Sequence, residues 1–185
     1  MSQVNDLQAV LNTADELFPE SAVEQAITVC ADAAAAKLAD QAPVVLVVMN
    51  GGMSFADRLL ARWSFPLELD YIHFTRYDGA TQGGSNKQIA NPRTPLQGRH
   101  VVVVDDIFDE GLTLADIHDW VLRQGASAVT SIVLTEKLHD RQKTDYRADY
   151  VALQVPDRYV FGYGMDYYGW LRNIRGIYAV QEALL

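Results

Sequence analysis

The hydrophobic positions in the first third of the chain indicate two helices followed by a strand. A first helix is predicted to end at Pro19, because five hydrophobic residues before it recur at helical spacing: Val4, Leu7, Leu11, Ala14 and Phe18. A second helix is predicted to begin at a capping box formed by Ser21 and Glu24. Its buried face is predicted to hold Val23, Ile27, Cys30 and Ala34. The run Pro43–Met49 (PVVLVVM) has no polar alternation, which is typical of a strand buried on both faces of a parallel sheet.

Strands and helices alternate along the rest of the chain. Further strands are predicted at Leu67–Phe74, His100–Val104, Ala128–Leu134 and Tyr150–Val155. A helix is predicted at Ser54–Trp63, and another from about Thr113 to a stop at Gly125. The inward face of this last helix is predicted to hold Leu114, Ile117, Val121 and Leu122. This alternation predicts an α/β fold with a mainly parallel, twisted sheet flanked by helices.

One long segment, Tyr77–Gln97, fits neither pattern. It holds three glycines and two prolines and has almost no large hydrophobic side chains. A loop of this length inside a compact domain is usually functional or disordered.

Composition and charge narrow the class of protein. The 185 residues are 49% hydrophobic and 21% charged, which suits one globular domain with a sizeable core. A net charge of -9 argues against binding to nucleic acid, because phosphate contacts need a basic face. A single cysteine excludes an internal disulfide. The N-terminus lacks the features of a signal peptide, and no apolar run approaches the ~20 residues that span a bilayer. We therefore expect a cytoplasmic protein with no membrane partner.

The candidate chemistry lies at residues 101–113, which read VVVVDDIFDEGLT. In open α/β sheets ligands bind beyond the carboxyl ends of the strands, and Asp105 and Asp106 follow such a strand directly. A helix that begins near Thr113 would direct free N–H groups to the same place, and Gly111 would let the backbone approach a ligand. The segment could seat a phosphate beside carboxylates that bind hydroxyls or a divalent cation. The alternative is a solvated turn that caps the helix, but three acidic residues fit it poorly because like charges repel.

Three other protein classes carry acidic residues in similar patterns. P-loop NTPases place acidic residues after an apolar strand, but the chain contains no G-x-x-x-x-G-K-[ST] motif. Receiver domains carry their acidic pair near the N-terminus rather than in mid-chain. Prenyl-diphosphate enzymes carry DDxxD on a helix, whereas four consecutive valines favour a strand.

Residues 101–113 resemble the phosphoribosyl-diphosphate (PRPP) signature of type I phosphoribosyltransferases. Four further segments resemble the hypoxanthine-guanine (6-oxopurine) branch of that family, in the same order along the chain: VVLVVMNGGMSFADRLL, HFTRYDGATQGG, LTEKL and DYVALQVPDRYVFGYGMDYYGWLRNIRGI. The resemblance implies a single phosphoribosyltransferase domain. Its core would cover about residues 37–150, and a small purine-binding hood would come from about residues 1–36 and 151–185.

The resemblance implies roles for the signature residues. Asp105 and Asp106 would bind the ribose of PRPP directly or through Mg²⁺, and Asp109 would be the catalytic residue near purine N7. The 5′-phosphate loop would be formed by Asp109, Glu110, Gly111, Leu112 and Thr113. Glu110 and Leu112 stand where the family usually has threonine and lysine. Since a carboxylate would repel phosphate, we expect the Glu110 side chain to point away from the loop.

The resemblance also implies residues for the purine and the diphosphate. Lys137 would donate to the oxygen at purine C6, which disfavours adenine because an ammonium group only donates. Tyr159 would stack on the purine, Val160 would contact its edge through the backbone, and Asp166 would reach the purine or a second Mg²⁺. The diphosphate would be bound by Asn50, Gly51 and Arg172.

Two expectations concern the backbone around this site. A non-proline cis peptide is expected between Met49 and Asn50. Arg76 and Tyr77 would open a mobile loop that closes over the reaction centre and excludes water.

The sequence therefore predicts a Mg²⁺-dependent purine-salvage transferase that converts PRPP and hypoxanthine or guanine to IMP or GMP and diphosphate. A homo-oligomer, either dimer or tetramer, is expected from the resemblance. Two alternatives stay open: a sister enzyme that uses xanthine or a pyrimidine, and a non-catalytic regulator that senses PRPP or nucleotides. The net charge disfavours an RNA-binding regulator, and Asp109 favours catalysis.

Overall fold

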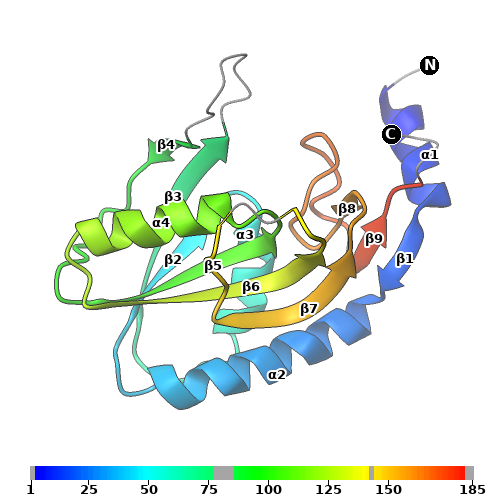
Figure 1. The fold of residues 1–185 in the computed structure, drawn as a ribbon. Coiled ribbons are helices and arrows are strands. Elements are labelled where there is room, and N and C mark those ends of the chain that lie inside the picture. Colours follow the sequence, from blue (N-terminus) through cyan, green and yellow to red (C-terminus); the bar gives the residue numbers. More distant parts are fainter. Residues whose placement is uncertain (1–2, 77–85, 142–143, 182–185) are drawn as a thin grey trace.

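The main sheet of the protein has six strands in the order β4-β3-β2-β5-β6-β7 (Figure 1). The computed structural model describes residues 3–76, 86–141 and 144–181. The strands are β2 (Val44–Val48), β3 (Glu68–Arg76), β4 (Asn86–Ala90), β5 (His100–Phe108), β6 (Ala128–Leu138) and β7 (Tyr150–Pro156). All neighbouring pairs are parallel except β3 and β4, which are antiparallel. The predicted mainly parallel sheet is confirmed.

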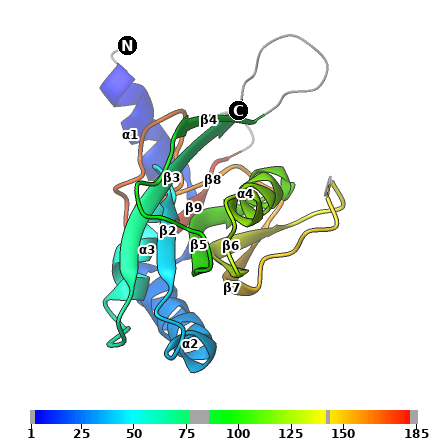
Figure 2. The same ribbon diagram turned by 90° about the vertical axis from the view of Figure 1, so that its left-hand side faces the viewer.

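Helices cover both faces of this sheet (Figure 2). α2 (Glu20–Leu38) and α3 (Gly52–Leu60) pack on one face, and α4 (Leu112–Arg123) packs on the other. Successive side chains of a strand point to opposite faces, so Val45 contributes to the core on the α2 side and Leu46 to the core on the α4 side. All five residues of β2 are buried, as expected for a strand covered on both faces.

A second, smaller sheet draws its strands from both ends of the chain. Its order is β1-β9-β8, formed by β1 (Asp15–Phe18), β9 (Ile177–Ala179) and β8 (Val160–Phe161). α1 (Gln3–Thr13) packs beside it around the buried side chains of Val10, Phe161, Leu171 and Val180. In Figure 1 this part stands beside the main sheet, beyond the end of β7. We call α1, β1, β8, β9 and the segment between β8 and β9 the hood.

Two expectations for the N-terminal segment were wrong. The first helix ends at Thr13 rather than at Pro19, because residues 15–18 pair with β9, which lies more than 150 residues further along the chain. α2 begins after Pro19 without a side-chain cap. Glu24, the acidic member of the predicted capping box, instead pairs with Arg58 and Arg62 of the α3 region.

Smaller differences concern three other segments. Leu122 was expected on the inward face of α4 but is 43% exposed. The predicted long loop contains a strand, β4, which extends the sheet at the edge of β3. β5 continues four residues past the valines, through both acidic residues, because Asp105 and Ile107 still pair with β6. Among the described helices, none is both long and apolar enough to cross a membrane.

Candidate active site

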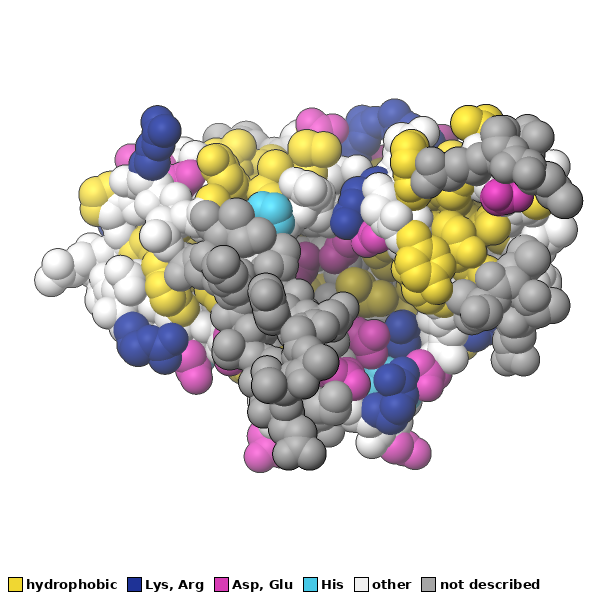
Figure 3. All heavy atoms as spheres, turned by 90° about the horizontal axis from the view of Figure 1, so that it is seen from above, with side chains coloured by type: hydrophobic (Ala, Val, Ile, Leu, Met, Phe, Trp, Pro, Cys, Tyr) yellow, Lys and Arg dark blue, Asp and Glu magenta, His cyan; other side chains and the backbone are white. Residues whose placement is uncertain are grey.

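The order of the strands creates a crevice between β2 and β5. Along the chain, β3 lies on one side of β2, whereas β5, β6 and β7 follow on the other side. Connections that leave in opposite directions open a crevice at the carboxyl ends of the two strands, which is the usual ligand site of such sheets. A cleft of about 320 Å³ lies there. Its polar lining residues are Asn50, Asp105, Asp106, Asp109, Thr113, Asp166 and Arg172. Figure 3, which views the molecule from above, shows acidic side chains around a central hollow.

Asp105 and Asp106 are the acidic pair at the bottom of this cleft. They are the buried charged residues of the described chain, at 7% and 9% exposure. The Asp106 backbone N–H donates to Asp105 Oδ1 at 2.9 Å, and Thr135 Oγ1 donates to the Asp106 carbonyl at 2.9 Å. Burial raises the pKa of both carboxyls, and repulsion by Asp106 raises that of Asp105 further. The pair is therefore suited to bind a cation or hydroxyl donors.

The loop after β2 lies directly over this pair. A cis peptide joins Met49 and Asn50, as the resemblance implied. A Cβ atom added to Gly51 would lie 1.9 Å from Asp106 Oδ2. Only glycine fits at this position, and the close approach brings the backbone of Asn50 and Gly51 to the edge of the cleft.

The N-terminus of α4 forms another wall of the cleft. Gly111 is the N-cap residue with φ 82°, and it lines the cleft together with Thr113. Free N–H groups of a first helical turn favour anions such as phosphate. Glu110 and Leu112 are not among the residues that line the cleft. The Glu110 carboxylate lies 3.9 Å from the Arg141 guanidinium, and the side chain is only 13% exposed.

Two side chains at the end of β6, those of Lys137 and His139, contact the Asp109 carboxylate. Lys137 Nζ donates to Asp109 Oδ2 at 3.0 Å, and His139 Nε2 lies 2.6 Å from Asp109 Oδ1. Burial alone would raise the pKa of Asp109, but the hydrogen bonds from Lys137 and His139 together lower it below its usual value. Asp109 is therefore a carboxylate with both oxygens engaged.

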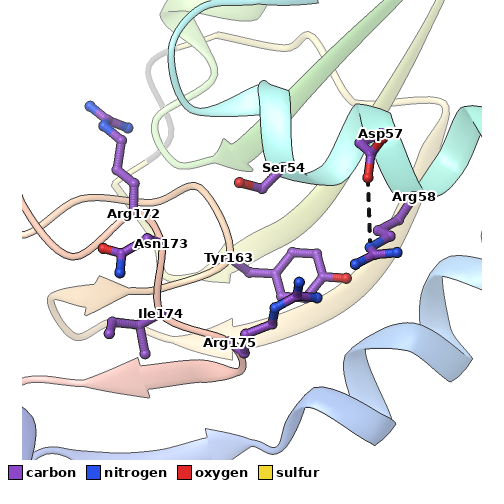
Figure 4. Close-up of a pocket in the computed structure, with 8 residues that line it drawn as sticks. All are labelled: Ser54, Asp57, Arg58, Tyr163, Arg172, Asn173, Ile174 and Arg175. Carbon is purple, nitrogen blue, oxygen red and sulfur yellow. Dashed lines mark ion pairs between the residues drawn. The ribbon is translucent and has the colours of Figure 1, made fainter.

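Arg172 connects the cleft with a second, smaller cavity. Its guanidinium lies 2.8 Å from Asp166 Oδ1 and 3.9 Å from Asp106 Oδ2, and it donates to the Gly164 carbonyl at 2.8 Å. The second cavity, of about 160 Å³, is shown in Figure 4, where Arg172 points away from Tyr163 and Arg175. Its other arginines pair with carboxylates: Arg58 with Glu24 and Asp57, and Arg175 with Glu20.

Val160 lies in the hood and Tyr159 directly precedes it, and neither is among the residues that line the cleft. Val160 is buried in β8, opposite Ala179 of β9. The ring of Tyr159 stacks on Tyr168 with centroids 5.6 Å apart, and its hydroxyl accepts from the Tyr168 backbone N–H at 3.3 Å.

The first part of the predicted mobile loop, residues 77–85, falls outside the described residues. Tyr77 lies there, and Arg76 is the last residue of β3, with no described side-chain position.

The chain matches a family of known proteins. A family model described as "Phosphoribosyl transferase domain" matches residues 13–169. The chain belongs to this phosphoribosyltransferase family. A hypoxanthine-guanine phosphoribosyltransferase of Bacillus subtilis (strain 168) is 32% identical over 146 residues, which cover 78% of this chain and 81% of the relative. A hypoxanthine-guanine-xanthine phosphoribosyltransferase of Tritrichomonas foetus is 32% identical over 145 residues, which cover 78% of this chain and 79% of the relative.

Solved structures of phosphoribosyltransferases have the same fold. A hypoxanthine-guanine-xanthine phosphoribosyltransferase superimposes with a TM-score of 0.83 at 28% identity, over 91% of this chain and 97% of that chain. A hypoxanthine phosphoribosyltransferase of Trypanosoma cruzi, in complex with the product IMP, superimposes with a TM-score of 0.84 at 26% identity, over 94% and 96% of the two chains. The α/β phosphoribosyltransferase fold predicted from the sequence is therefore confirmed.

The sequence motifs did not select several residues at this cleft, among them Phe74, Ile107 and His139. Phe74 and Ile107 line the cleft, and His139 contacts Asp109. Ile107 lies inside the signature and could have been selected from its position alone. Phe74 and His139 lie in other segments, and nothing in their spacing along the sequence relates them to the acidic residues.

Proposed function

We propose that the protein is a purine-salvage enzyme that transfers the phosphoribosyl group of PRPP to hypoxanthine or guanine, giving IMP or GMP and diphosphate. The observation that carries this proposal is the buried Asp105–Asp106 pair, which lies between the cis-peptide loop and the N-terminus of α4. The names of the relatives support 6-oxopurines as the bases.

The cleft offers separate places for the parts of PRPP. The carboxylates of Asp105 and Asp106 would accept hydrogen bonds from the ribose hydroxyls. The backbone N–H groups of residues 109–113 and the Thr113 hydroxyl would bind the 5′-phosphate at the N-terminus of α4. Asn50, Gly51 and Arg172 would bind the diphosphate, since all three line the same cleft. Arg172 supplies the cationic group for that part.

The purine would lie between Asp109, Lys137 and the hood. Lys137 would leave Asp109 to donate to the C6 oxygen, and the freed carboxylate oxygen would face N7. Tyr159 would stack on the base, and Val160 would contact its edge. The described Tyr159 ring already stacks on Tyr168, so the base would bind beside this pair or displace Tyr168.

Mg²⁺ fits the donor set of the cleft. Within the described residues, no group of three or more His, Cys, Asp or Glu side chains could hold a metal ion by itself. Mg²⁺ commonly binds one or two carboxylates together with substrate oxygens, and the Asp105–Asp106 pair is a buried anionic group of that kind. Asp105, Asp106 and Asp166 would hold the ion with the oxygens of PRPP. The bound ion would neutralise the charge that develops on the leaving diphosphate.

Three wider features belong to the same proposal. The chain would form one phosphoribosyltransferase domain with its hood, and act in the cytoplasm. Arg76 and Tyr77 would open a loop that closes over the cleft. The homo-oligomer implied by the resemblance belongs to the same proposal.

The test is an assay of the purified protein with PRPP, Mg²⁺ and each base in turn. We expect hypoxanthine and guanine to give IMP and GMP, and adenine and pyrimidines to give no product above background. Product from xanthine alone or from a pyrimidine would establish a sister enzyme instead. Tight PRPP binding without turnover of any base would establish the regulator.

A further inference from the structure

Of the two described side-chain hydrogen bonds to the proposed catalytic carboxylate, the one to His139 is shorter than the one to Lys137. His139 Nε2 lies 2.6 Å from Asp109 Oδ1, and its side chain is only 2% exposed. It follows β6 directly, two residues after Lys137, so one strand end brings two partners to the two oxygens of Asp109. A buried histidine beside a carboxylate in a cleft is a group that the proposed roles leave unused.

The hydrogen bonds around the imidazole determine which nitrogen carries the hydrogen. The backbone N–H of Arg141 donates to His139 Nδ1 at 2.9 Å. A backbone N–H is only a donor, so Nδ1 must be the acceptor. In the neutral ring the hydrogen then lies on Nε2, which donates to Asp109 Oδ1. While the Arg141 bond holds, the lone pair of Nδ1 is occupied, and His139 acts on Asp109 only as a donor.

Purine binding changes the two partners of Asp109 differently. Lys137 would turn to the C6 oxygen of the base, and this would free Asp109 Oδ2. His139 is buried and held by the Arg141 backbone, so its bond to Oδ1 would persist. We propose that His139 is a positioning residue that keeps Asp109 oriented toward purine N7, as a carboxylate that is ready to accept the N7 proton when the nucleotide forms. This inference rests on the proposed function.

Nucleotide formation exchanges one bond at C1′ for another. The N9–C1′ bond forms, and the bond from C1′ to the diphosphate oxygen breaks with its electron pair remaining on diphosphate. The N7 proton passes to Asp109 Oδ2, while Oδ1 keeps the hydrogen bond from His139. A donor fixed on Oδ1 orients the carboxylate so that Oδ2 faces the base.

Several charged groups surround Asp109. Burial raises its pKa, and the bonds from Lys137 and His139 lower it by more. Asp109 also raises the pKa of Arg141, although the hydrogen bond from Arg141 to Asp157 contributes most to that shift. The remaining charged residues of the cleft are Asp105, Asp106, Asp166 and Arg172, and Glu110 follows Asp109 in the chain. Once Lys137 has turned to the base, His139 is the hydrogen-bond donor left to stabilise the carboxylate.

Two substitutions of His139 distinguish a role in positioning Asp109 from a role in packing alone. His139→Leu keeps a side chain of similar size but removes the donor, whereas His139→Gln keeps an N–H that can reach Asp109. We expect His139→Leu to lower kcat on the order of tenfold and to leave the KM for PRPP unchanged. By ¹³C NMR the Asp109 carboxyl should titrate at a higher pH in His139→Leu than in the unmodified protein, because a bond to its charged form is lost. His139→Gln should keep most of the wild-type kcat and should leave the titration of Asp109 close to that of the unmodified protein. His118→Leu, on the outer surface of α4, is the matched control.

A second measurement uses the unmodified protein. ¹⁵N NMR of the imidazole rings should show a protonated Nε2 and an acceptor Nδ1 for the histidine whose signals are lost in His139→Gln. A hydrogen on Nδ1 of His139 would overturn the inference, as would an Asp109 titration that is the same in His139→Leu. Equal loss of kcat in His139→Leu and His139→Gln would also contradict it. If the unmodified protein forms no nucleotide, the proposed function fails, whereas these spectra still test the bond to Asp109.

Discussion

At the scale of single residues, the acidic pair shows how burial prepares a site at the expense of stability. Asp105 and Asp106 are buried next to each other, and the Arg172 guanidinium lies 3.9 Å from Asp106 Oδ2. The folded protein therefore holds a proton on this pair more tightly than the unfolded chain does. A carboxyl whose folded pKa is raised contributes stability at low pH that is lost as the pH rises through that pKa.

We expect Asp105→Asn to stabilise the metal-free protein at neutral pH and to abolish turnover. Asparagine does not titrate, so the variant should gain on the order of 1 kcal/mol in the free energy of unfolding. The gain should shrink as the pH falls toward about 4, where the aspartates of both the folded and unfolded wild type become protonated. Urea unfolding in EDTA at several pH values measures this. A variant that is less stable at every pH would contradict the role assigned to repulsion.

Lys137 is the residue that should determine the choice of base. Lys137→Met removes the donor to the C6 oxygen, so we expect kcat/KM for hypoxanthine to fall by about a hundredfold or more. Adenine should then be discriminated against less strongly. Assays with both bases measure the ratio, and Lys37→Met on α2, whose ammonium lies over the Tyr150 ring, is the control. Unchanged base preference would refute the assignment.

At the scale of elements, the cleft is made by the ends of strands and the start of a helix. Much of this could be predicted from the sequence, because a strand, a tight turn and a helix follow one another within residues 101–123. The same holds for β2, the cis-peptide loop and α3. The pairing of β1 with β9 could not be predicted, since residues 15–18 continue a helical hydrophobic pattern and only a distant partner strand makes them extended.

The loop after β2 offers a test of how closely two elements must approach. Gly51 has an ordinary helical φ of -65°, so alanine could adopt its backbone conformation. The alanine Cβ would nevertheless collide with the Asp106 carboxylate. We expect Gly51→Ala to lower kcat/KM for PRPP on the order of a hundredfold, because a displacement of ~1 Å in a site can have that effect. Gly98→Ala is the control: its φ of 72° strains alanine, but nothing lies within 4 Å. The Gly98→Ala variant should be less stable than the unmodified protein but should keep its turnover.

At the scale of the whole molecule, the hood is held to the core by a polar cluster around Glu24. The Glu24 carboxylate of α2 pairs with Arg58 and Arg62 of the α3 region and accepts a short hydrogen bond from Tyr163 of the hood. Burial alone would raise the pKa of Glu24, but the bonds from Tyr163 and Arg62 together with the arginine charges lower it. Stability from a lowered pKa is present above the unfolded value and is lost as the pH falls through the folded one.

Glu24→Gln should therefore destabilise the protein by about 1 kcal/mol at pH 7. The difference should disappear in acid, below the lowered folded pKa, where the wild-type carboxyl is itself protonated. Thermal or urea unfolding at both pH values measures it. Glu68→Gln removes a more exposed pair with Arg99 and should change stability little. Equal effects of the two substitutions would contradict a special role for the cluster.

The sequence by itself determined the order of the helices and of the parallel strands, and the acidic turn that follows one of these strands. These features depend on neighbours within about 15 residues, where hydrophobic spacing and glycine positions act directly. Only the tertiary structure decided that His139 meets Asp109 across 30 residues, that Glu24 meets Tyr163 across 139, and that both ends of the chain share one sheet. Such contacts depend on which surfaces the packed core brings together, and no local pattern encodes that.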